Sequence, residues 1–145
     1  MDLQRTIHIG GNVGGIGKIF EAYKVLQPPT QQCIMKLTSW NITGLSSPGK
    51  YRMIKNRIQQ EKPQVFFMQE TKCKSTTLDQ TIRKAWPSSK VVAVDPSEAL
   101  GGLTIVWDEQ AIMLTNIHVS KHFIQATFHI TGTNVHGHLT NVYFP

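Results

Sequence analysis

Two oxygen-bearing side chains that follow successive strand patterns are the first candidates for chemistry in this sequence. Asn41 follows a strand pattern that starts at Met35, and Glu70 comes just after the apolar run of residues 65–68. Mg²⁺ prefers hard oxygen ligands and keeps several waters, so one carboxylate and one amide oxygen suit a partial magnesium site. Such an ion stabilises a phosphoryl group under attack and activates water. The pair therefore indicates phosphate-ester hydrolysis. The plainer interpretation, in which Glu70 ends a strand in solvent and Asn41 starts a turn, stays open.

A helix pattern between these two strands determines how they are oriented. Apolar residues recur at helical spacing between residues 50 and 61, after a strand pattern at 36–40 and before another at 64–69. A right-handed crossover through a helix makes its flanking strands parallel. We therefore predict that Asn41 and Glu70 emerge at the same rim of one sheet, where the sites of α/β proteins usually lie.

The other elements include one more helix and several strands. We expect a helix start at Ser47–Pro48, a capping box at 76–79 that opens a second helix ending before Pro87, strands at 91–94 and 103–107, and strands at 124–130 and 135–143 joined by a turn at 131–134. Crossover helices early and antiparallel strands late favour an α/β sandwich with a mixed sheet over a doubly wound fold.

Residues 1–34 do not continue this pattern. They contain a glycine-rich stretch at 10–17 and a short helical pattern from Ile16 to Leu26, which two prolines stop. The glycine spacing fits neither the phosphate loop nor the dinucleotide fingerprint. We expect residues 1–34 to be an unassigned, flexible N-terminal extension and residues 35–145 to form the domain.

The charge of the chain is unevenly distributed. The net charge is +6, but residues 35–94 carry eleven Lys or Arg against three Asp or Glu, whereas residues 95–145 carry one against four. A basic segment of this kind suits a polyanionic partner such as DNA. A solvated helix face with ordinary loops would have the same composition, so the charge alone does not decide between them.

Nothing in the sequence indicates secretion, membrane insertion or a metal-binding cysteine cluster. Cys33 and Cys73 form no C-x-x-C pair, and free thiols in a reducing compartment are the expected state. No run approaches the roughly 20 apolar residues of a membrane span. A nuclear or cytoplasmic location without a membrane partner is the default expectation. His136 and His138 share a strand face, across a turn from His129, and three imidazoles can bind zinc, but an exposed strand face is the favoured interpretation.

Four short motifs resemble those of one known superfamily, in its order and spacing. Residues 40–45 read WNITGL, residues 62–72 KPQVFFMQETK, residues 101–108 GGLTIVWD and residues 141–145 NVYFP. They resemble the endonuclease/exonuclease/phosphatase superfamily, and within it the apurinic-endonuclease-like domain of plant LINE-type (non-LTR) retrotransposons. The resemblance covers about residues 35–145. It implies a four-layer α/β sandwich with a mixed sheet, of which this chain would be the N-terminal part.

The resemblance also implies roles for five residues. Glu70 would bind Mg²⁺, or Mn²⁺ in its place, and Asn41 would lie beside the metal and the scissile phosphate. Tyr143 would approach the phosphate through its hydroxyl. Gln69 would support the site from behind the metal ligand. Lys72 would touch the phosphate backbone, although an ordinary surface lysine is the favoured interpretation. The implied activity is metal-dependent hydrolysis of a DNA phosphodiester bond.

The later motifs of the family are absent from these 145 residues. In the family they supply the residues that position water and the general-base histidine. Thr43 also stands where the repair enzymes have Asp, but this departure is common in the retrotransposon branch and says little about activity. We therefore expect a truncated domain that binds metal weakly and is inactive alone. We also expect it to self-associate through exposed sheet edges, with the apolar faces of Ile124, Ala126, Phe128 and Val142 uncovered. Two alternatives stay open: a non-catalytic retroelement remnant that binds nucleic acid weakly, and a phosphatase of the same superfamily.

Overall fold

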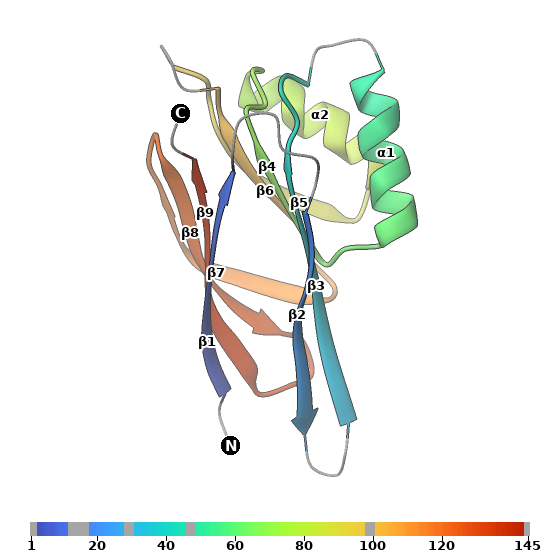
Figure 1. Ribbon diagram of the computed structural model, residues 1–145, viewed down its shortest axis with the longest axis vertical. Coiled ribbons are helices and arrows are strands. Elements are labelled where there is room, and N and C mark those ends of the chain that lie inside the picture. Colours follow the sequence, from blue (N-terminus) through green and yellow to red (C-terminus); the bar gives the residue numbers. More distant parts are fainter. Residues whose placement is uncertain (1–2, 12–17, 28–30, 46–48, 98–100, 144–145) are drawn as a thin grey trace.

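The chain folds into two stacked β-sheets, with two helices packed on the outside of one of them. In a computed structural model (Figure 1), the structure describes residues 3–11, 18–27, 31–45, 49–97 and 101–143, with side chains from Met35 onward. The elements are β1 (Leu3–Gly11), β2 (Lys18–Gln27), β3 (Gln31–Asn41), α1 (Lys50–Glu61), β4 (Val65–Gln69), α2 (Ser75–Ala85), β5 (Ser89–Val94), β6 (Leu103–Asp108), β7 (Ile112–Val119), β8 (Phe123–Ile130) and β9 (Val135–Tyr143).

Both sheets contain parallel and antiparallel neighbours. Sheet I has the strand order β1-β9-β8-β7, and sheet II has the order β2-β3-β4-β6-β5. Among the described strands, β1 and β9 are parallel in sheet I, β3 and β4 are parallel in sheet II, and the other neighbours are antiparallel. The α/β class with a mixed sheet, predicted from the order of the elements, is confirmed.

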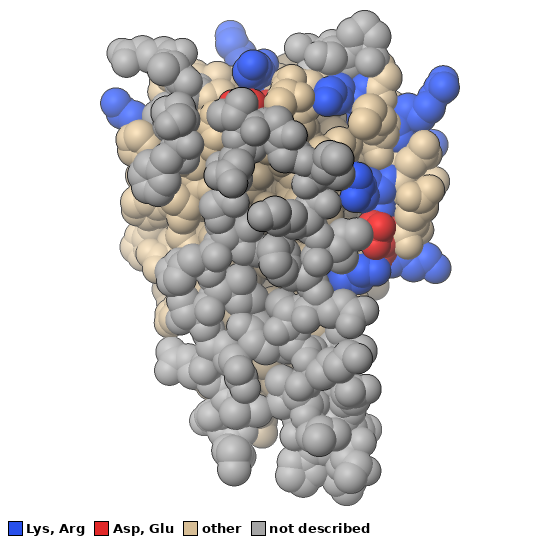
Figure 2. Space-filling model, viewed as in Figure 1, with Lys and Arg blue, Asp and Glu red and all other residues tan. Residues whose placement is uncertain are grey.

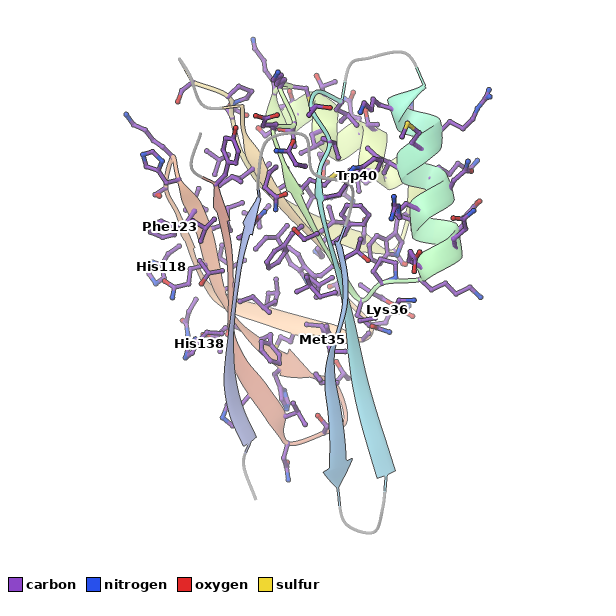
Figure 3. All side chains as sticks on the ribbon, in the orientation of Figure 1. Met35, Lys36, Trp40, His118, Phe123 and His138 are labelled. Atoms are coloured by element: carbon purple, nitrogen blue, oxygen red, sulfur yellow. The ribbon has the colours of Figure 1, made fainter. Side chains whose placement is uncertain are left out.

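Strand β4 lies at the centre of the packing and is buried on both faces. Val65 and Phe67 belong to the core between the two sheets, whereas Phe66 and Met68 belong to the core between sheet II and the helices. Burying each such side chain contributes about 1.5–3 kcal/mol, which explains why residues 65–68 are all apolar. Figure 3 shows the same division on β3, with Met35 toward sheet I and Trp40 toward α1.

The two helices occur where the sequence predicts them, but one of their caps differs. The backbone N–H of Ser75, at the start of α2, donates to Asp95 Oδ1 at 2.7 Å. The predicted capping box at residues 76–79 is therefore wrong, and Asp79 instead pairs with Arg83 one turn later at 2.9 Å. A carboxylate from a distant segment can accept this N–H as well as a local side chain can. The predicted start of α1 at Ser47–Pro48 lies outside the described residues. No helix in the described ranges is long and apolar enough to cross a lipid bilayer.

Residues near the N-terminus add one strand to each sheet. β1 pairs with β9 and β2 pairs with β3, so the short helix predicted from Ile16 to Leu26 is wrong. An open strand edge offers a row of backbone hydrogen bonds, which outweighs a weak helical pattern. Strand β3 also starts at Gln31, before the boundary expected at residue 34. The glycine-rich stretch lies, from 12 to 17, outside the described residues. The division into a flexible extension and a domain stays a prediction.

The apolar residues of β8 are covered, contrary to our expectation. Ile124, Ala126 and Phe128 are at most 1% exposed, because sheet II of the same chain packs against them. Val142 is half-buried and alternates with the inward-facing residues of β9, on the other side of sheet I.

Apolar side chains instead remain exposed on the outer face of sheet I and along strand β7. Met113 and Val119 are 56% and 51% exposed, and Figure 3 shows Phe123, His118 and His138 on the side of sheet I that faces away from sheet II. Strand β7 also ends the order of sheet I, so one of its backbone edges is unpaired within that sheet. Self-association through this region stays a prediction.

Candidate functional site

The ends of β3 and β4 meet at one rim of sheet II, as the crossover rule predicts. The two strands are parallel, with Asn41 opposite Gln69. The segments that follow β3 and β4 continue side by side, because Ile42 N–H donates to Gln69 O at 3.1 Å and Gly44 N–H donates to Glu70 O at 2.8 Å. Asn41 and Glu70 therefore lie at the same rim on adjacent strands, and this part of the prediction is confirmed.

Tyr143 reaches this rim from the other sheet. Its hydroxyl donates a short hydrogen bond to Glu70 Oε1, although 73 residues separate the two. Both side chains are buried, Tyr143 at 3% and Glu70 at 9% exposure. Burial, then the hydrogen bond and the charge of Glu70, raise the pKa of Tyr143 to about 12. The phenol therefore keeps its proton at neutral pH and acts as a donor to the carboxylate.

Asn41 is held in a fixed turn beside this pair. Its side chain is 6% exposed, and its Oδ1 accepts the backbone N–H of Thr43 at 3.2 Å. An Asn side chain that accepts a hydrogen bond two residues along stabilises a local turn. Thr43 has a positive φ of 49°, consistent with that turn.

Gln69 lies behind Glu70 and joins the two sheets. Its Nε2 donates to Ser39 Oγ at 3.0 Å within sheet II and to Asn141 Oδ1 at 2.8 Å in sheet I. Asn141 Nδ2 in turn donates to the backbone oxygens of Met68 and Thr104, at 3.1 and 2.9 Å. With the Asn141 amide nitrogen committed to two carbonyls, its oxygen must face the Gln69 nitrogen, which sets the orientation of both amides.

Two residues of this neighbourhood were missed by the sequence analysis. Asn141 belongs to the motif at residues 141–145 but received no role there, although an amide on the same strand face as Leu139 and Tyr143 is a signal for a buried polar contact. Lys50, at the start of α1, donates from Nζ to Thr43 Oγ1 at 3.3 Å. This contact brings a cation of α1 to the loop that follows Asn41.

Lys72 lies at the surface beside the same rim. Its side chain is exposed, its φ is 51°, and its backbone N–H donates to Gly101 O at 2.5 Å. The side chain is therefore free to meet solvent or a ligand, while the backbone is fixed against β6.

The histidines of sheet I do not form a zinc site among the described residues. His129 lies directly opposite His136, but His129 Nε2 contacts Thr133 O at 2.6 Å and His136 Nδ1 contacts Asn134 O at 3.2 Å. No group of three His, Cys, Asp or Glu side chains in the described ranges is placed to hold a metal ion. His129 is exposed, and His136 and His138 are half-buried.

Comparisons with known proteins identify the fold. No family model matches the chain, and no curated protein matches it significantly. Among solved structures, the chain is similar to an endonuclease/exonuclease/phosphatase family protein from Bacteroides thetaiotaomicron, with a TM-score of 0.58 and 13% identity over 74% of this chain and 50% of that one. It is similar to an AP endonuclease from Archaeoglobus fulgidus, with a TM-score of 0.57 and 18% identity over 77% of this chain and 41% of that one.

A third similar structure is D. rerio TDP2 complexed with a single-strand DNA product, with a TM-score of 0.56 and 15% identity over 73% of this chain and 44% of that one. The chain thus spans half or less of the length of these three structures. At such low identity the similarity shows the fold alone. The chain has the α/β sandwich fold of endonuclease/exonuclease/phosphatase proteins.

Proposed function

We propose that this chain is a fragment of a Mg²⁺-dependent DNA endonuclease of retrotransposon origin. The observation that carries the proposal is the contact between Tyr143 and Glu70, which joins two of the implied site residues across 73 positions. Asn41 lies at the same rim on the neighbouring parallel strand. If the resemblance of the short motifs were a coincidence, there would be no reason for Asn41, Glu70 and Tyr143 to lie at one rim. The similarity to an AP endonuclease and to a structure with a DNA product supports the nucleic-acid substrate.

The donors at the rim fit magnesium better than zinc. Glu70 offers a carboxylate and Asn41 an amide oxygen, and Mg²⁺ is commonly bound through one or two carboxylates while keeping several waters. Structural zinc sites need four His, Cys or carboxylate ligands, and the described residues hold no cluster of even three. When bound, the ion would stabilise charge on the phosphoryl oxygens and activate water. Binding through so few protein ligands is expected to be weak.

The residues of the chain would position the substrate around that ion. Glu70 would bind the metal, and Asn41 would orient the metal-bound water or the phosphate. Tyr143, protonated at neutral pH, would approach the phosphate through the hydroxyl that contacts Glu70 in the structure. Gln69 would keep Glu70 in place through the contacts that its amide makes with both sheets.

Metal binding at Glu70 tests this proposal directly. We expect Mn²⁺, followed by electron paramagnetic resonance, to bind the chain weakly and to bind Glu70→Gln at least about tenfold more weakly, since even the loss of a residue that supports a metal ligand costs about 10–100-fold. Glu109→Gln is the matched control, because Glu109 is an exposed carboxylate that pairs only loosely with Lys90, at 3.8 Å. Equal Mn²⁺ affinity in the chain and in Glu70→Gln would mean that Glu70 is not the metal ligand.

The basic surface of α1 is the expected contact for the DNA backbone. Figure 2 shows Lys and Arg side chains gathered along the side of the molecule that α1 occupies in Figure 1. Lys50 and Arg57 lie over the Trp40 ring, at 5.9 and 5.1 Å from its centroid, which holds these two cations beside the rim. Lys50 also contacts Thr43, so the basic surface is continuous with the loop after Asn41.

We predict weak, salt-sensitive and sequence-independent DNA binding through this surface. If about four phosphates are contacted, raising the salt from about 50 to 200 mM weakens binding roughly 100-fold by counterion release. The double variant Arg52→Gln/Lys55→Gln removes two exposed cations of α1. It should lower the slope of log affinity against log salt concentration by about 2, because each lost phosphate contact lowers that slope by about 1. The measurement is a fluorescence anisotropy titration of labelled duplex.

The control for this experiment is Lys90→Gln/Lys121→Gln, which removes the same charge from exposed positions away from α1. An equal loss of slope in both double variants would show that net charge alone is responsible. DNA binding without any loss of Mn²⁺ affinity in Glu70→Gln would favour the non-catalytic remnant over the nuclease.

A further inference from the structure

We propose that Gly101 and Gly102 are positioning residues for Glu70. Because neither glycine has a side chain, their backbone lies directly against the turn that carries Glu70. The inference rests on the proposed role of Glu70 as the metal ligand. Both glycines begin the motif at residues 101–108, and the resemblance gave neither of them a role. Both precede β6, whose first residue, Leu103, lies opposite Gln69 in sheet II.

The turn that carries Glu70 needs support because its backbone is strained. Glu70 and Lys72 have φ values of 53° and 51°, and two non-glycine residues in the left-handed region so close together are uncommon. The turn is held on one side by the loop after β3, where Gly44 N–H donates to Glu70 O and Leu45 N–H donates to Thr71 O, both at 2.8 Å.

Gly101 holds the other side of this turn. Its carbonyl accepts the backbone N–H of Lys72 at 2.5 Å and the hydroxyl of Thr71 at 3.4 Å. A Cβ added at Gly101 would lie 3.0 Å from Glu70 Cα and 3.3 Å from both Glu70 Cβ and Cγ. Because one of these atoms belongs to the backbone, a rotamer change of Glu70 cannot relieve the contact. The turn itself would have to move by some tenths of an ångström.

Gly102 adds a second constraint of a different kind. Its φ is +94°, and a Cβ there would lie 2.5 Å from Thr71 Oγ1 and 3.0 Å from Val94 O. Position 102 therefore requires glycine for two reasons: other residues rarely adopt this backbone conformation, and a side chain would collide with Thr71, the residue after Glu70. Together the two glycines let β6 lie directly against the Glu70 turn.

The consequence is functional because Glu70 has two partners that depend on its exact placement. Tyr143 donates to its Oε1, and Mg²⁺ demands near-ideal octahedral geometry from its ligands. A site must be held to within about 0.5 Å to work. A methyl group at Gly101 is therefore expected to disturb both partners without removing any functional group.

Three glycine variants separate crowding from backbone strain. Gly101→Ala introduces the contact with Glu70 at a position without a positive φ. Gly102→Ala introduces both strain and a contact. Gly132→Ala is the matched control, because Gly132 has a φ of +75° and no atom within 4 Å of the added Cβ. Glu70→Gln serves as the reference for a lost carboxylate.

Two readouts are measured on each variant, neither of which is catalytic activity. The first is the ¹³Cζ resonance of Tyr143 in chain labelled with ¹³C-tyrosine at neutral pH, assigned with Tyr143→Phe, which reports the hydrogen bond to Glu70 without any metal. The second is Mn²⁺ affinity. We expect Gly101→Ala to shift the Tyr143 resonance toward its position in Glu70→Gln and to weaken Mn²⁺ binding by about 10–100-fold. Gly132→Ala should change neither.

If Gly101→Ala does not fold, Gly102→Ala with and without Thr71→Ala decides the matter. Removing Thr71 Oγ1 relieves the 2.5 Å contact, so the double variant should recover part of the Tyr143 shift. A Tyr143 resonance that stays in place in Gly101→Ala, or in Gly102→Ala, would overturn the inference. If Glu70→Gln leaves Mn²⁺ binding unchanged, the metal proposal fails, while the Tyr143 resonance still tests the positioning role on its own.

Discussion

The purified chain, incubated with supercoiled plasmid and Mg²⁺, is expected to leave the plasmid intact. The described residues bring one carboxylate, Glu70, together with Tyr143 and the Asn41 strand end. Among those residues no cluster of three His, Cys, Asp or Glu side chains can hold a metal ion. The resemblance implies that the general base comes from later motifs, and losing a positioned base costs about 10²–10⁴ in rate. The measurement is the appearance of nicked circles on an agarose gel.

Glu70→Gln is the control that separates this chain from a contaminating nuclease. Nicking that occurs equally with both proteins is contamination, because the proposed reaction at the rim requires the Glu70 carboxylate. Nicking by the parent chain and not by Glu70→Gln would contradict the predicted inactivity, and it would show that these 145 residues suffice for hydrolysis.

Asn141→Ala is expected to lower the free energy of unfolding by about 2–4 kcal/mol. The variant removes the donor to Met68 O and Thr104 O and the acceptor for Gln69 Nε2, all in a region closed to solvent. Leaving buried polar groups unpaired costs about 1–3 kcal/mol each, with partial relief from rearrangement. For a chain of this size the midpoint of thermal unfolding should fall by roughly 10 °C. Differential scanning calorimetry measures both quantities.

The matched control is Asn134→Ala, in the exposed turn between β8 and β9. Its free energy of unfolding should lie within about 0.5 kcal/mol of that of the parent chain. Asn141→Asp provides a second comparison, because it preserves the shape but places a carboxylate oxygen against two backbone carbonyls. We expect it to be less stable than Asn141→Ala. An Asn141→Ala variant as stable as the parent would show that the contact between the sheets contributes little.

The sequence by itself determined the crossover that builds the rim. The apolar run of β4 and the helical spacing of α1 can both be identified from local periodicity, and the handedness rule then makes β3 and β4 parallel. Asn41 and Glu70 had to emerge at the same rim because each directly follows one of these strands. The turn at 131–134 and the strands on either side were also predicted correctly, since alternation and turn residues are local signals.

Pairing at open strand edges was decided by the tertiary structure. The pattern from Ile16 to Leu26 favours a helix when considered alone, yet residues 18–27 pair with β3. Local propensity is worth a few tenths of a kcal/mol per residue, whereas an adjacent strand satisfies a whole row of backbone groups. The cap of α2 follows the same logic, because Asp95 is placed against Ser75 by the path of the chain after β5.

The contacts that complete the candidate site also come from the tertiary structure. Alternation shows which face of β8 is inward, but only the stacking of sheet I on sheet II brings Tyr143 to Glu70 and Asn141 to Gln69. The closeness of Gly101 to Glu70 likewise depends on how β6 approaches β4. These distances follow from the packing of two cores at once, in which each side chain affects the position of all the others. A periodic pattern in the sequence specifies the face of a strand but not its distance from the strand that packs against it.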